Sequence, residues 1–317
     1  MNGVIGFVLA VLVYPGLVAA AVAALLLGWV RASARGAIAG AGASNPLGLL
    51  RETRSMLATD STQPDTHPAA LVIGTYAALV LPLVALALLP VPGNPIVSSI
   101  GLGADVLAEG ALLLGMPLAR LFIGWVTPSA QTRLAADRFS RAVAGAVLPM
   151  ALALTVTSTQ VGSALIGSPR PTGNVLALAA RVIAAAAFAC ALPVLAHSTS
   201  LVFAGSALDA PGGELAELSG RDLALMRIGE AVQLVAVCTF FVTAFVVPVF
   251  AQVSATVGVA AIWIVGLLMT AAGIGIWDGL RGGRIEGRER APLTWWVGVP
   301  VLLALLALVA STWGHAR

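Results

Sequence analysis

The sequence contains no lysine, and its 317 residues include only three histidines and two cysteines. Charged residues make up 10% of the chain, whereas a soluble domain carries about 25%. This shortage of charge excludes an ordinary water-soluble domain. The accompanying share of hydrophobic residues, 59%, also excludes an intrinsically disordered chain, which needs low hydrophobicity and high net charge.

Sequence motifs for cofactor binding are missing as well. Cys190 and Cys238 lie in separate apolar runs without a CxxC pair, so they indicate neither a disulfide framework nor an iron–sulfur site. His67, His197 and His315 are scattered, and no apolar run carries the paired histidines that a haem needs. Glycine-rich phosphate loops, HExxH and GxSxG are absent. We therefore expect no metal and no cofactor bound by this chain itself, and no nucleic-acid partner.

Long apolar runs are what the sequence does contain. A bilayer-spanning helix needs about 20 mainly apolar residues, and eight stretches meet this requirement: 4–30, 69–90, 104–127, 142–166, 175–197, 223–250, 255–276 and 293–313. The sequence therefore predicts an all-α, polytopic membrane protein in which residues 1–317 form a single integral membrane domain with about eight transmembrane helices.

The distribution of arginine predicts the orientation of these helices. Most arginines fall in the regions that follow the first, third, fifth and seventh stretches: Arg31, Arg35, Arg51, Arg54, Arg133, Arg138, Arg141, Arg221, Arg227, Arg281, Arg284, Arg288 and Arg290. The opposite side has only Arg170, Arg181 and Arg317, and Arg120 lies within the third stretch. By the positive-inside rule these odd-numbered loops are cytoplasmic, both termini lie outside, and the protein is expected in the cell (inner) membrane.

Charged side chains inside a bilayer are costly, so each one suggests a functional site. Asp105, Glu109 and Arg120 lie at about 0°, 40° and 60° around a helix that covers the third stretch. Their shared face suggests a partly hydrated stripe inside the bundle. The alternative places the acids at the outer headgroup boundary. This alternative is favoured for Asp105 and left open for Glu109, one turn deeper.

The loop between the fifth and sixth stretches is rich in acids. Asp209, Glu214 and Glu217 precede Arg221 and the start of the sixth stretch. There Arg227 and Glu230 are spaced i, i+3, so an ion pair could permit burial of both. A series of carboxylates that leads into a span predicts a proton path, with Asp209, Glu214, Glu217, Glu230, Glu109 and Asp105 as candidates. The alternative is a solvated loop followed by one paired, buried glutamate.

Residues 45–57 predict a short amphipathic helix at the membrane surface. Leu49, Leu50, Met56 and Leu57 recur at helical spacing, opposite the charged residues Arg51, Glu52 and Arg54. Such a helix could simply line the headgroups. It could equally form the lip of a cavity that opens sideways into lipid, where a quinone would enter.

The stretch from Glu217 to Glu230, ELSGRDLALMRIGE, resembles the E-Y-S-G-x-x-F/L-A-L block of a known family. That family is the membrane subunit shared by respiratory NADH–quinone oxidoreductase, where it is subunit 1, and formate hydrogenlyase, where it is subunit 4. Glu230 matches a span-six glutamate of the NADH dehydrogenase branch, and Asp209 matches the acid of the family's E-L-x-E-G. The spacing from Asp105 through Gly124 and Ser129 to Arg138 is similar to the hydrogenase-type branch.

The resemblance implies a membrane-anchor and coupling subunit that links cytoplasmic redox chemistry to proton movement. Soluble hydrogenase-like and iron–sulfur subunits would dock on its cytoplasmic arginines, among them Arg138, Arg221 and Arg227, which could also pair with acids. Antiporter-like membrane subunits and lipid would surround it, and a quinone could be a ligand.

Two other hypotheses compete with this one. A stand-alone secondary transporter would use Asp105, Glu109 and Glu230 as ion ligands, although no inverted repeat is visible. A purely structural anchor would use its acids only for pairing.

Overall fold

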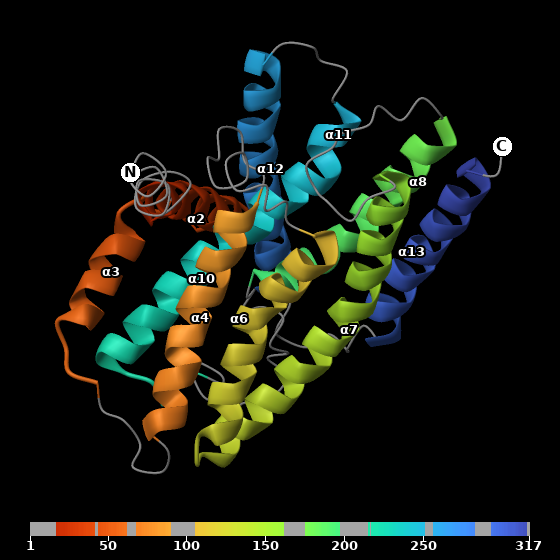
Figure 1. The fold of residues 1–317 in the computed structure, drawn as a ribbon. Helices are drawn as coiled ribbons and strands as arrows, with labels where there is room; N and C mark the ends of the chain where they lie inside the picture. Colours follow the sequence, from red (N-terminus) through yellow and green to blue (C-terminus); the bar gives the residue numbers. More distant parts are fainter. Residues whose placement is uncertain are drawn as a thin grey trace, which may run out of the picture.

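The structure, a computed structural model, describes residues 17–41, 44–61, 68–89, 105–161, 175–196, 215, 217–250, 256–282 and 293–315. These residues form helices and no β-strand (Figure 1). The long helices are α2 (Leu17–Ala39), α4 (Pro68–Leu88), α6 (Val106–Val126), α7 (Ala130–Val161), α10 (Gly220–Phe241), α12 (Thr256–Gly282) and α13 (Leu293–His315). The shorter elements are α3 (Gly48–Leu57), α8 (Val175–Ala189), α9 (Leu192–Leu195), the π-helix η3 (Val242–Val246) and α11 (Val247–Val249).

The predicted class, an all-α multi-pass membrane protein, is confirmed. Six of the described helices are long and apolar enough to cross a bilayer, and two shorter apolar helices cover 175–189 and 298–311. Every predicted stretch therefore contains a described helix. The exposed surface fits this environment, because large apolar side chains such as Ile73, Val265 and Met269 point outward.

The predicted ends of three spans are wrong. The helix α2 continues to Ala39, α7 begins at Ala130 and α12 ends at Gly282. Arginines that the sequence placed in loops, including Arg31 and Arg138, are therefore helical. The error arises because the apolar run measures only the lipid-facing length, whereas a helix continues wherever its backbone bonds stay satisfied.

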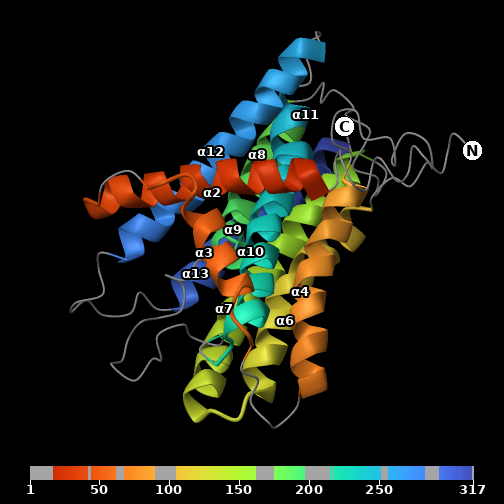
Figure 2. The ribbon, with the colours of Figure 1, turned by 90° about the vertical axis from the view of Figure 1, so that its left-hand side faces the viewer.

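The helix α2 crosses the bundle at a steep angle to α4 and α10, whereas α4, α6, α7 and α10 run roughly side by side (Figures 1 and 2).

Close contact between α2 and α12 depends on two glycines. A Cβ on Gly275 would collide with the carbonyl oxygen of Arg31, and one on Gly279 would lie 2.7 Å from Cβ of Ile38. Small residues four apart allow such backbone approach in membranes.

Two spans are interrupted next to proline. The helix α8 ends at Ala189, and the short α9 begins with Pro193 within its first turn. In the sixth span the π-turn η3 precedes Pro248, which lacks an N–H and clashes with the carbonyl four residues earlier. At the end of α9 the carbonyls of Leu195 and Ala196 bond to other helices, and the site uses these bonds.

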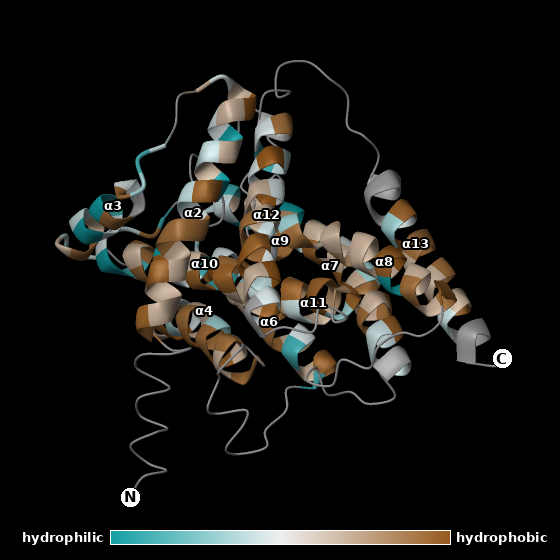
Figure 3. Cartoon of the chain, turned by 90° about the horizontal axis from the view of Figure 1, so that it is seen from above, coloured by the Kyte–Doolittle hydropathy of each residue, from teal (hydrophilic) through white to brown (hydrophobic). Residues whose placement is uncertain are grey.

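The predicted surface helix is present as α3, with one correction. Leu50, Thr53, Arg54 and Leu57, spaced i, i+3, i+4 and i+7, all line one cavity, so Arg54 lies on the same face as the leucines rather than opposite them. Seen from above, α3 lies at the edge of the bundle and carries several hydrophilic residues (Figure 3).

Candidate functional site

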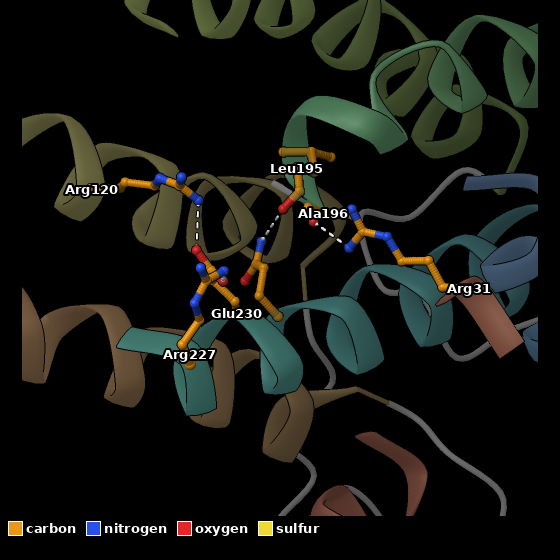
Figure 4. Close-up of polar contacts among 7 residues, drawn as sticks. Arg31, Arg120, Leu195, Ala196, Arg227 and Glu230 are labelled. Atoms are coloured by element: carbon orange, nitrogen blue, oxygen red, sulfur yellow. Dashed lines mark hydrogen bonds and ion pairs between the residues drawn. The ribbon is translucent and has the colours of Figure 1, made fainter. Parts of the chain in front are cut away.

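One carboxylate inside the bundle is held between two arginines. Glu230, on α10, accepts from Nη1 of Arg120 on α6 through Oε1 at 2.6 Å, and from Nη1 of Arg227 through Oε2 at 3.0 Å. Figure 4 shows Arg120 reaching Glu230 from α6, with Arg227 close beside Glu230 on α10. The i, i+3 pair with Arg227 was predicted from the sequence. The contact with Arg120 was not.

Burial strengthens this arrangement. The side chains of Arg120 and Glu230 are 5% and 14% exposed, whereas that of Arg227 is 36% exposed. Charge-assisted hydrogen bonds of this kind are about twice as strong as neutral ones. Arg120 also lies 5.6 Å from the ring centroid of Phe139 on α7, a distance suited to a cation–π contact. Two guanidinium groups therefore share the carboxylate of Glu230.

Gln233, one turn further along α10, is fully buried and bonds to two backbone carbonyls. Its Nε2 donates to the carbonyl oxygens of Leu113 at 2.7 Å and Leu195 at 3.2 Å. The first belongs to α6 and the second to α9, so one amide links three elements. These bonds satisfy the NH2 group of the buried amide, whereas its Oε1 has no hydrogen-bond partner among the described residues.

A second ion pair joins α2 to α12. Nε of Arg31 lies 2.9 Å from Oδ2 of Asp278, whose side chain is 3% exposed. Arg31 also donates from Nη1 to the carbonyl oxygen of Ala196, at the end of α9, at 2.9 Å (Figure 4). The carbonyls of Leu195 and Ala196 therefore bond to two different helices.

Glu109 and Asp105 lie in different surroundings, although the sequence placed both on one face. Asp105 caps α6, and its Oδ1 accepts from the backbone N–H of Leu107 at 2.8 Å. Glu109 is fully buried, and neither of its carboxyl oxygens has a hydrogen-bond partner among the described residues. A carboxylate without a partner is expensive to bury, so Glu109 suggests a functional site in the membrane.

The remaining predicted residues lie near the ends of helices or outside the described chain. Asp209 and Glu214 fall outside the described residues. Glu217 is half-buried just before α10, Arg221 is exposed in its first turn, and Arg138 is half-buried on α7. The structure therefore brings Glu230 and Arg227 together with Arg120, and leaves Asp105 and Glu109 apart from that cluster as a cap and a lone acid.

An apolar cavity of about 330 Å³ lies between α2, α3, α4 and α10. Its walls include Ala24 and Leu79, and its polar side chains are Thr53, Arg54 and Arg227. One of the two interpretations of the surface helix, the lip of a cavity, agrees with this position. Arg227 also binds Glu230, so this one side chain belongs both to the cavity wall and to the group formed by Arg120, Arg227 and Glu230.

Three features of the site were not predicted from the sequence. Arg120 had no partner that local spacing could assign, Gln233 is one neutral residue in an apolar run, and the arginine distribution assigned Arg181 to the outer side. Arg181 lies on α8 and is 2% exposed, with Nε and Nη1 lacking a partner among the described residues. The available signal in all three cases was a polar residue inside an apolar run of spanning length.

Comparisons with known proteins agree with this architecture. No curated protein matched the sequence. Among solved structures, the chain is similar to a chain of the membrane-bound sulfane sulfur reductase, an archaeal respiratory membrane complex, with a TM-score of 0.65 and 16% identity. That similarity covers 90% of this chain and 95% of the other and concerns the fold. The family model for NADH dehydrogenase matches residues 9–310. Since this match spans nearly the whole sequence, the chain belongs to the NADH dehydrogenase family.

Proposed function

We propose that this chain is the membrane-anchor and coupling subunit of a formate-hydrogenlyase-like or NADH-dehydrogenase-like complex, and that it links cytoplasmic redox chemistry to proton movement. Family membership and the likeness to a respiratory membrane complex support the role of a membrane subunit. The observation that carries the coupling role is Glu230, held between Arg120 and Arg227 at the predicted cytoplasmic entrance to the sixth span.

Two arginines that share one carboxylate can respond to charge. Arg227 is partly exposed, and Arg120 is almost fully buried. A new negative charge near Arg227 would compete with Glu230 for the guanidinium group of Arg227 and leave the carboxylate to Arg120. The response would thus pass from the cytoplasmic surface to α6, the helix that also carries the lone acid Glu109. Glu109 would exchange a proton in response to that change.

The proposed partners are inferred from the arginines on the predicted cytoplasmic side and from the apolar outer faces of the helices. Soluble hydrogenase-like and iron–sulfur subunits would dock near Arg138 and Arg221, which could attract acidic patches. Antiporter-like subunits would pack on the exposed apolar faces within the cell (inner) membrane. The proton path would begin at the loop acids Asp209, Glu214 and Glu217.

A quinone remains a prediction for the cavity between α2, α3, α4 and α10. Its apolar walls fit an isoprenoid chain, and Arg54 and Arg227 could donate hydrogen bonds to a ring oxygen. A photoreactive quinone analogue added to membranes would label α3 or α10 if this prediction is correct.

The coupling role is tested by Glu230→Gln, which keeps the shape and removes the titratable group. We expect the complex to assemble and its redox-linked proton movement, measured in native membrane vesicles, to fall several-fold. Glu52→Gln is the matched control, because Glu52 is an exposed acid on α3. Normal proton movement in an assembled Glu230→Gln complex would assign Glu230 a structural role and leave the anchor hypothesis standing.

A further inference from the structure

A groove with a volume of about 700 Å³ runs along α12. Its opposite wall comes from the two interrupted spans, with Ala189 and Pro193 at the break between α8 and α9, and Val246 at the end of η3. On α12 the groove extends from Ala261 to Trp277, which is about 24 Å at the helical rise of 1.5 Å per residue. None of the described residues that line this α12 groove is charged.

The length and chemistry of the α12 groove decide what can fill it. The hydrocarbon core of a bilayer is about 30 Å thick, so an acyl chain that enters from one side covers about 15 Å. A groove of about 24 Å crosses the boundary between the two leaflets, as a transmembrane helix does and a single acyl chain does not. The apolar lining also offers no partner to a phosphate headgroup.

The helix α12 is packed on one side only. Within the apolar part of this span, Gly258–Leu280, 22% of the residues are buried, compared with 67% for the sixth span, Gly220–Val249. The main contact of α12 is with α2, where Gly275 faces the backbone of Arg31. Gly273, which lines the α12 groove, lies about 200° from Gly275 around the helix. The groove is therefore on the side of α12 that α2 leaves uncovered.

Gly273 is a glycine that the packing of the described chain does not require. A Cβ at this position would meet no described atom within 4 Å, whereas a Cβ on Gly275 would collide with the carbonyl oxygen of Arg31. Glycine inside a helix is destabilising relative to alanine, and in membranes it allows another backbone to approach closely. The open space at Gly273 therefore fits the approach of a helix from outside this chain.

We propose that the α12 groove receives an apolar transmembrane helix of another membrane subunit, which comes closest at Gly273. Assembly would cover Met269, a groove residue whose side chain is 69% exposed. The proposal rests on the proposed function in one respect, namely that this chain is a subunit of a membrane complex. It does not depend on proton coupling.

The first test uses the complex, purified from native membranes in mild detergent through a tag on this chain. Gly273→Leu fills the groove, and the open space around Gly273 should leave the thermal stability of the purified full chain unchanged. We expect the amount of co-purified membrane subunits to fall several-fold. Gly298→Leu on α13 is the matched control, because a Cβ there also meets nothing within 4 Å and Gly298 does not line the groove.

Two outcomes of this first test would contradict the proposal in different ways. Full recovery of the membrane subunits with Gly273→Leu would overturn the proposal and leave the proposed function standing. If the chain without any substitution purifies alone, the proposed function fails, and the proposal fails with it.

The second test introduces the photoreactive residue p-benzoylphenylalanine into the native complex. Val265 and Ile264 are neighbours on α12 with side chains 57% and 52% exposed, but only Val265 lines the groove. The label at Val265 should form several-fold more cross-links to another membrane subunit than the label at Ile264. Labels at Ala261 and Trp277, at the two ends of the groove, should reach the same transmembrane segment of that subunit. Cross-links only to phospholipid, or to a second copy of this chain, would overturn the proposal.

Discussion

Glu230 and Glu109 are both acids within helices of the bundle, yet their surroundings are opposite. Glu230 accepts hydrogen bonds from two arginines, one on its own helix and one on α6. Glu109 is fully buried with no described hydrogen-bond partner. The difference indicates that Glu230 contributes to the stability of the bundle, because removing it takes away the counter-charge of a buried cation. Glu109 makes no described hydrogen bond that its removal would break.

The largest effect is expected from Glu230→Leu. This change removes the carboxylate that Arg120, which is 4% exposed, binds, and breaking a buried ion pair in this way costs about 3–5 kcal/mol of unfolding free energy. Thermal unfolding of the purified full chain, together with its abundance in the membrane, measures the loss. The double variant Arg120→Leu/Glu230→Leu should recover much of it, because apolar replacement of a whole pair is often neutral. If the double variant lost as much unfolding free energy as the two single variants added together, Arg120 and Glu230 would contribute independently and not as a pair.

Asp278→Ala extends the comparison to the second paired acid. Arg31 loses its bond to this carboxylate, but it is 20% exposed and keeps its bond to the carbonyl of Ala196. We expect a smaller cost of about 1.5–3 kcal/mol, the range for hydrogen bonds to charged groups. The same unfolding measurement checks it. A cost equal to that of Glu230→Leu would show that exposure of the remaining arginine does not matter.

Asp105→Ala tests an acid whose described hydrogen bond caps the start of helix α6. Loss of the bond from the N–H of Leu107 should cost about 1 kcal/mol, and Asp105→Asn should retain most of the stability. Proton movement in vesicles should be unchanged in both variants. Impaired proton movement with normal stability would return Asp105 to the proton path.

Glu109→Gln should have the smallest effect on stability, less than about 1 kcal/mol, because no hydrogen bond to a described residue is lost. Proton movement linked to redox chemistry should nevertheless fall, because the titratable group is gone. This pattern is the reverse of that for Asp105→Ala. A large loss of stability with normal proton movement would place Glu109 with Glu230 as a structural acid and remove the contrast between them.

The class of fold and one local pair could be predicted from the sequence, for physical reasons that also set the limits of prediction. Bilayer thickness fixes how long an apolar run must be to form a span, and so predicts the spans. The spacing of residues on a helix predicts the Arg227–Glu230 pair. The Arg120–Glu230 bond joins residues 110 positions apart, which no local pattern reveals. Gln233 was not predicted as a site residue because a single amide hardly changes the apolar character of the run in which it lies. The ends of α2 and α7 were misplaced because a helix can continue after its apolar run has ended.

The interruption between α8 and α9 has a mechanical consequence. The carbonyls of Leu195 and Ala196 end the fifth span and hold Gln233 of α10 and Arg31 of α2, respectively. In the sequence, the loop that leads to Asp209 and Glu214 follows Ala196 directly. A displacement of the end of α9 would therefore reach α2 and α10 together. The end of the broken helix is thus a joint that ties α2 and α10 to each other through α9.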